Sequence, residues 1–320
     1  MKKERKFDRR EFLRLAGLTG AGLVAEEIGR RFYGGSKVEA APLVETLPER
    51  VSWETHVPYR ASFQGTSNCT SLATSELMRM EMNRLYGGFR EGICNQASSD
   101  PYSDQVFNPN FLTGSWRSVV LSLYQTGDAL VRNGICRNHI APNFIEQGDP
   151  TSIPTDEQKQ DALNYRPSSF DLKMYNPTEI RQTDAVAEVR KRVMTGPIVL
   201  GFPTFPGSLE TYNGGFVKRL SDGQEFTSGH AVPLIGYDDN VVTPDGSMGV
   251  FYLWWSQLYD VSIAMMPYEY VNDVGKMPDT NLNAYIDTLK LNFDQQPPAT
   301  PTPAPELKNK VFIPLVVRNE

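Results

Sequence analysis

The chain has 320 residues, of which 40% are hydrophobic and 22% are charged. It is therefore long and apolar enough to form one sizeable folded core with appendages, and it is not a disordered protein. The formal net charge is −6, but the first 40 residues carry ten Lys and Arg against six Asp and Glu, so the rest of the chain has a net charge of −10. This balance argues against nucleic acid as a partner of the folded part.

The N-terminal segment has the features of an export signal. Arg9 and Arg10 precede a short, moderately apolar stretch, residues 15–25, in the arrangement of a twin-arginine signal. This stretch is too short and too rich in glycine to remain in a bilayer, which requires roughly 20 apolar residues. We assign residues 1–40 to the signal, with cleavage after Ala40 or after Ala25. The alternative is an ordinary amphipathic first helix.

Export has consequences for the mature protein. We expect it outside the cytoplasm, secreted or at the cell surface, with no integral membrane segment. Such a compartment permits disulfides, and the chain has three cysteines. If Cys69 stays a free thiol, Cys94 and Cys136 can pair with each other; the alternative is three unpaired thiols.

Helices are predicted mainly in the first half of the chain. Residues 70–86 are mostly good helix formers with apolar residues recurring every three or four positions, so Cys69 stands at the N-terminus of a helix. The partial positive charge at that end favours a thiolate and predicts a lowered pKa for Cys69. Residues 89–105 are predicted to be a loop, and further helices are expected after residues 107–111 and over residues 127–133.

Strands are predicted mainly in the second half, which gives an α+β architecture in two lobes. A helix over residues 184–195 is followed by a strand over residues 198–202. Residues 228–239 (SGHAVPLIGYDD) indicate a buried strand with a histidine near its start, and residues 250–254 a further strand. Residues 294–309 form a proline-rich linker. The apolar tail, residues 310–320, could be an edge strand, a disordered segment or a means of cell-surface association.

Three residues offer the chemistry of a cysteine peptidase. Such an enzyme needs a thiolate, an imidazole that activates it and later protonates the leaving amine, and donors for the oxyanion of the tetrahedral intermediate. Cys69, His230 and the side chain of Gln64, together with the backbone amide of Cys69, can supply all of these.

The order Gln64, Cys69 and a distant His230 in a strand resembles the papain family of cysteine peptidases, particularly its exported bacterial members. The resemblance covers roughly residues 47–272. Further segments that carry it are residues 108–111 (NPNF), 134–136 (GIC), 196–201 (GPIVLG), 214–216 (GGF), 229–232 (GHAV), 236–239 (GYDD) and 266–271 (MPYEYV), the last of which looks like the closing strand of bacterial members.

The resemblance implies a papain-like α+β fold over residues 41–293, with a helical N-terminal lobe that carries the cysteine and an antiparallel β lobe that carries the histidine. By it, Cys69 is the nucleophile, His230 the general base and acid, and Gln64 an oxyanion donor. The implied activity is hydrolysis of peptide bonds in proteins or peptides, with no cofactor. We expect no metal site, because the three histidines lie far apart and the cysteines show no paired spacing.

Three departures from the family pattern bear on activity. Trp255 stands where the family has an asparagine that orients the imidazole, and an indole has no acceptor for the imidazole N–H; Gln257 or Asp260 could substitute. Thr70 and Asn68 replace a tryptophan and a small residue beside the nucleophile. Gln64 precedes Cys69 by five residues, whereas the family usually has six.

The departures leave alternative functions open. One is a catalytically impaired papain-like domain that binds peptides in the same place. Another is a related thiol hydrolase of the bacteriocin-processing or cell-wall amidase type. The long helical segment between Cys69 and His230 favours the papain layout over those more compact domains.

Overall fold

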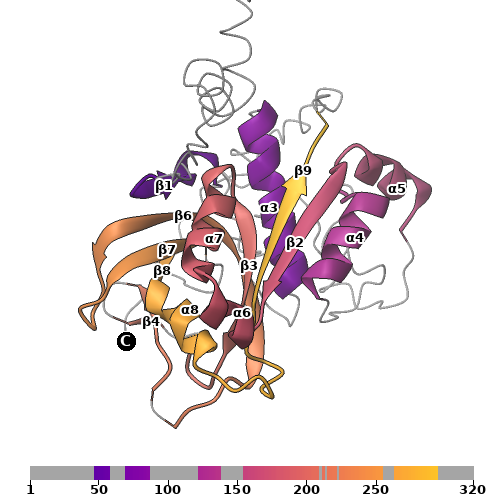
Figure 1. The fold of residues 1–320 in the computed structure, drawn as a ribbon. Coiled ribbons are helices and arrows are strands. Elements are labelled where there is room, and N and C mark those ends of the chain that lie inside the picture. The colour runs from indigo at the N-terminus through magenta and orange to yellow at the C-terminus, as the bar shows by residue number, and fades with distance from the viewer. Residues whose placement is uncertain are drawn as a thin grey trace, which may run out of the picture. The chain divides into compact units, whose positions relative to one another are not determined.

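The computed structural model describes residues 47–57, 69–86, 122–137, 154–208, 211–212, 215–221, 223–254 and 263–294. The chain separates into two compact units, Met1–Pro48 and Glu49–Glu320, and nearly all described residues belong to the second (Figure 1). The expected signal segment, most of the proline-rich linker and the C-terminal tail lie outside the described residues.

Local sequence explains where several helices of the second unit begin. Three of them begin with a capping box, in which the side chain of Ser122, Thr155 or Asn176 accepts the backbone N–H three residues on. None of the described helices has both the length and the apolar composition that crossing a membrane requires. The helices are the 3-10 helix η1 (Glu54–His56), α3 (Cys69–Tyr86), α4 (Leu123–Asn133), α5 (Asp156–Leu163), α6 (Pro177–Gln182), α7 (Ala185–Met194) and α8 (Tyr268–Gly275).

Nine strands in the described residues form one sheet. Their order is β2-β9-β3-β6-β7-β8-β5-β4, and β1 pairs with β6. Neighbouring strands run antiparallel except β5 and β8, which are parallel. The strands are β1 (Arg50–Ser52), β2 (Ser169–Tyr175), β3 (Ile198–Thr204), β4 (Thr211–Tyr212), β5 (Phe216–Val217), β6 (Ser228–Val242), β7 (Met248–Trp254), β8 (Ile263–Pro267) and β9 (Ile286–Asn292).

Alternation along β3 divides the core between the two faces of the sheet. Val199 belongs to a cluster with side chains of α3 and α4, whereas Leu200 belongs to a cluster with side chains of α7 and α8. Both Val199 and Leu200 are fully buried. The helical first half of the chain and the strand-rich second half were both predicted, and the α+β architecture is confirmed.

Helix α3 is buried along most of its length although it contains many polar residues. Burial of polar groups is tolerated when they form hydrogen bonds. Ser75 donates to the carbonyl of Leu72 at 2.8 Å, and Arg84 pairs with the buried Glu81 at 2.6 Å. The helix is therefore an internal support that fixes the position of its first residue, Cys69.

The predicted closing strand at residues 266–271 is wrong in its second half. Strand β8 ends at Pro267, and Tyr268 begins α8. Within α8, Tyr270, Val271 and Val274 are buried against the core, with the spacing of one helix face rather than of a strand.

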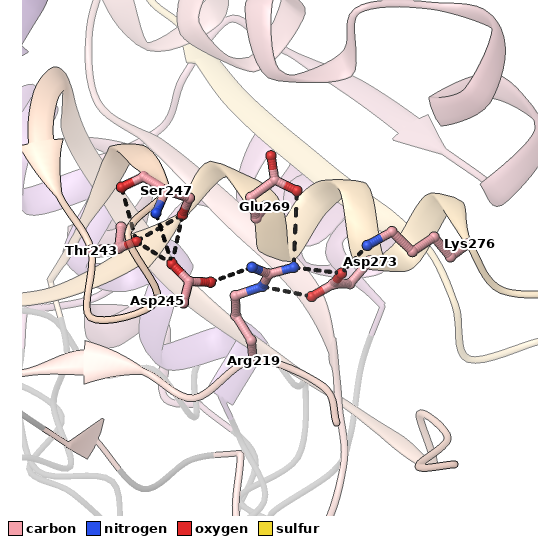
Figure 2. A network of polar contacts seen from close by, with 7 residues as sticks. All are labelled: Arg219, Thr243, Asp245, Ser247, Glu269, Asp273 and Lys276. Carbon is pink, nitrogen blue, oxygen red and sulfur yellow. Dashed lines mark hydrogen bonds and ion pairs between the residues drawn. The ribbon is translucent and has the colours of Figure 1, made fainter. Parts of the chain in front are cut away.

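A polar network ties α8 to two other segments (Figure 2). Arg219, which follows β5, makes a bidentate pair with Asp273 of α8, both contacts at 2.8 Å. The same guanidinium contacts Asp245 in the turn between β6 and β7. Asp245 also accepts hydrogen bonds from Ser247 and Thr243, and Lys276 contacts Asp273 at 2.8 Å. These contacts join α8 to the segment after β5 and to the turn between β6 and β7.

Candidate active site

The packing of α3 against β6 brings Cys69 to the strand that carries His230. Cys69 is the first residue of α3 and is partly exposed. Backbone N–H groups of Ala231, Thr70 and Cys69 itself stabilise its thiolate. Two of these donors belong to the N-terminus of the helix, where N–H groups lack partners within the helix, and the third follows His230 directly.

The predicted lowering of the Cys69 pKa is wrong for this structure. The N–H donors act in the predicted direction, but burial is the larger effect, and the net result is a pKa raised above the ordinary 9.0. The free-energy cost of removing the thiolate from water exceeds the stabilisation that the three N–H donors provide. The helix N-terminus was visible in the sequence, whereas the depth at which the thiol lies was not.

His230 is held inside the protein. It lies on β6 opposite Phe202 of β3, and the two rings pack edge to face with centroids 5.8 Å apart. Only 6% of the residue is exposed, and burial lowers the pKa of the imidazole from 6.5 to about 4. At neutral pH, Cys69 is therefore a thiol and His230 a neutral imidazole, which can accept a proton.

Other predicted site residues lie outside the described residues. They include Gln64, Trp255 and the two proposed substitutes for the orienting asparagine, Gln257 and Asp260. Cys94 is outside as well.

Cys136 is described and is a buried free thiol that donates to the carbonyl of Arg137 at 3.5 Å. Burial, reinforced by the charge of Asp161, raises its pKa, so Cys136 has the properties of a structural cysteine rather than of a nucleophile.

The sequence analysis missed two polar residues, Asp287 and Tyr285, whose pKa values burial raises. Asp287 on β9 is partly buried, and this burial raises its pKa from 3.8 to about 6. The pKa of Tyr285 is raised by burial and then by the charges of Asp287 and Cys69. The one local sequence signal that could have drawn attention to Asp287 is the presence of a carboxylate within the alternating strand IDTLKLN. The position of Asp287 opposite Gly201 of β3 depends on sheet register, which is not local.

A pocket elsewhere in the protein is too distant from Cys69 to be part of this site. Its volume is about 200 Å³, and Met82, Tyr86 and Phe293 are among the residues that line it. Tyr86 is the last residue of α3, which has 18 residues and therefore spans about 27 Å. In the described part of the chain, no three His, Cys, Asp or Glu side chains gather as metal ligands would.

Comparisons with known proteins place the fold. No protein-family model matches the sequence, and no curated protein matches it. Among solved structures, xylellain, a cysteine protease from Xylella fastidiosa, is similar with a TM-score of 0.53 at 18% identity, over 78% of this chain and 87% of that one. Digestive procathepsin L 3 from the larval midgut of Tenebrio molitor is similar with a TM-score of 0.50 at 13% identity, over 79% of this chain and 72% of that one. The chain therefore has the α+β fold of the papain-like cysteine proteases.

Proposed function

We propose that the protein is a cysteine peptidase in which Cys69 is the nucleophile and His230 the general base and acid. The observation that carries this proposal is the contact of the Cys69 sulfur with the N–H of Ala231, which directly follows His230, at the N-terminus of a buried helix. The fold shared with xylellain, a cysteine protease, supports the same assignment.

The chemistry follows from the protonation states. Because Cys69 is a thiol and His230 is neutral, the imidazole takes the thiol proton as sulfur attacks the scissile carbonyl carbon. The carbonyl electrons move to oxygen, where the N–H of Cys69 and the amide of Gln64 are the proposed donors. The oxyanion collapses, and the amine leaves with the proton from His230. Water then hydrolyses the thioester with His230 as base, which regenerates the thiol.

The test is hydrolysis of fluorogenic peptides by the mature protein and two variants. Cys69→Ala should abolish cleavage, whereas Cys136→Ser, which alters a buried thiol outside the site, should retain it. Cleavage that survives in Cys69→Ala would refute the assignment of the nucleophile.

A second candidate function is a catalytically impaired domain that binds peptides. The raised pKa of Cys69 and the lowered pKa of His230 favour it, because both oppose a thiolate–imidazolium pair at rest. Trp255 in place of the orienting asparagine adds to this argument. Peptide cleavage and peptide binding, measured together, separate the two: an active peptidase cleaves the fluorogenic peptides, whereas an impaired domain binds them in calorimetry and cleaves none.

We further propose that the protein acts outside the cytoplasm on protein or peptide substrates, after export by the twin-arginine route. Arg9 and Arg10 before the short apolar stretch support this. Replacing both arginines by lysine should leave the protein inside the cytoplasm with its signal uncleaved, as fractionation and mass spectrometry would show. Normal export of that variant would argue against the route. The tail, residues 310–320, is the segment proposed for cell-surface association.

A further inference from the structure

Strand β2 forms one end of the sheet and has an accessible outer edge. It pairs with β9 on one side, and no strand of the described residues pairs with it on the other (Figure 1). Lys173 and Met174 are consecutive and therefore project on opposite faces of the sheet, yet both are exposed, Met174 to 55%. The edge can thus be approached from both faces in this part of the strand.

The residues of β2 do little to block pairing with a further strand. Protein edge strands are commonly protected by proline, by a bulge or by lysine. The seven residues of β2 contain no proline, and their register with β9 is continuous. Their one lysine, Lys173, follows an acidic residue, Asp171, by two positions, so that the two charges lie on the same face of the sheet.

This spacing makes β2 complementary to itself in the antiparallel direction. When two copies pair about a two-fold axis through Leu172, Asp171 of each copy lies opposite Lys173 of the other. Directly opposite residues have Cβ atoms about 4.5–5.5 Å apart, and opposite charges at such positions stabilise the pairing. Charge complementarity therefore favours a second copy of this chain as the occupant of the edge, in one register.

The other face of the strand is complementary in the same register, through apolar contacts. Phe170 packs against the buried cluster that includes side chains of α4, and the exposed ring of Tyr124 on α4 lies 5.7 Å from the ring of Phe170. The two-fold pairing brings Met174 of the second copy opposite Phe170. Sulfur–aromatic contacts of this kind are favourable. Side chains that are exposed in the single chain thereby become covered.

The carboxylate of Asp171 is already held in place on its own chain. Nη1 of Arg192 contacts its Oδ2 at 2.7 Å, while the side chain of Asp171 remains 57% exposed. A carboxylate can accept several donors, so this contact leaves room for a lysine from a second copy. Because the carboxylate is fixed before the copies meet, less side-chain entropy is lost when they pair.

We propose that the protein forms a symmetric dimer in which the β2 strands of two copies pair antiparallel about Leu172 and join their sheets. The pairing of seven residues buries less than the roughly 800 Å² per partner of a standard interface. The dimer is therefore reversible, with a Kd on the order of 10 µM. The inference does not depend on peptidase activity.

Sedimentation velocity of residues 41–320 tests the dimer, with Cys69→Ala included in every sample so that self-cleavage cannot occur. The protein should change from monomer to dimer between about 1 and 200 µM. Asp171→Lys and Lys173→Asp each place like charges opposite each other twice, so each should raise the Kd by about tenfold or more. An equimolar mixture of these two variants should dimerise again, because opposite charges then face each other at both positions. Recovery in the mixture also shows that both variants are folded.

A matched control and hydrogen exchange complete the test. Asp156→Lys makes the same charge change at an exposed position on α5 and should leave the Kd unchanged. The amides of residues 169–175 should exchange more slowly as the dimer forms. A protein that is monomeric throughout would overturn the inference, and protected β2 amides in that monomer would show that another part of the chain covers the edge. A Kd that neither single variant changes, or a mixture that stays monomeric, would equally overturn it.

Discussion

Burial of His230 makes the stability of the protein depend on pH in a way that can be calculated. The pKa of the imidazole is 6.5 in the unfolded chain and about 4 in the folded protein. Between these values, the unfolded state binds one more proton, so the free energy of unfolding falls as pH decreases. The stability is fully present above pH 6.5 and is lost as pH falls through 4. At 1.36 kcal/mol per pKa unit, the loss is about 3 kcal/mol.

The assay compares urea unfolding of the wild type and His230→Gln at intervals between pH 7.5 and 4. Glutamine does not titrate. Between pH 7.5 and 4, the wild type should therefore lose about 3 kcal/mol of unfolding free energy relative to His230→Gln. His56→Gln, which removes a histidine outside the site, is the matched control. Parallel stability curves for the wild type and His230→Gln would refute the assignment of a buried, neutral imidazole.

Asp287 should produce the opposite slope in the same experiment. Its pKa rises from 3.8 to about 6 on folding, so the folded state binds the extra proton and stability falls as pH rises through this window. The magnitude is at most about 3 kcal/mol, because the side chain keeps some contact with solvent. The two groups largely cancel in the wild type between pH 4 and 6. In Asp287→Asn, the free energy of unfolding should therefore fall more steeply than in the wild type as pH decreases from 6 to 4. In His230→Gln, it should instead rise as pH decreases over this range.

Three further predictions concern the rest of the fold. Arg219→Met should lower the free energy of unfolding by about 3 kcal/mol in urea, because it leaves the buried carboxylate of Asp273 with only an exposed lysine; an unchanged midpoint would contradict this. Gly134→Ala should cost more than about 2 kcal/mol in thermal unfolding, since Gly134 has φ of 72° and the new Cβ would lie 1.9 Å from the carbonyl oxygen of Ala162. Cys136 should resist iodoacetamide in the native protein and react in urea, because burial raises its pKa; modification of native Cys136 found by peptide mapping would count against this.

Local patterns predicted the elements that carry the site. The helix expected over residues 70–86 is α3, and the strand expected over residues 228–239 is β6, which continues to Val242. These assignments rest on periodicity and on helix and strand signals that lie within about 20 residues of one another. They located Cys69 and His230 correctly on their elements.

Properties that depend on distant segments could not be predicted. The direction of the Cys69 pKa shift is set by how deeply β6 and its neighbours bury the thiol, so the helix terminus alone gave the wrong sign. The position of Asp287 opposite Gly201 is set only by the register of β9 on β3, which joins residues more than 80 positions apart. Residues 268–271 carry aromatic and β-branched side chains that suit a strand, yet tertiary packing makes them α8.

The position of β9 also determines when the candidate site can exist during synthesis. This strand is the last in the described residues, yet it lies between β2 and β3 and pairs with both (Figure 1). A ribosome-bound chain that has emerged only as far as α8 already contains Cys69 and His230, but β3 has an open edge and Asp287 is absent. Sheets closed by such distant pairings form slowly. We therefore expect the sheet that carries His230 to be complete only after nearly the whole described part of the chain has left the ribosome.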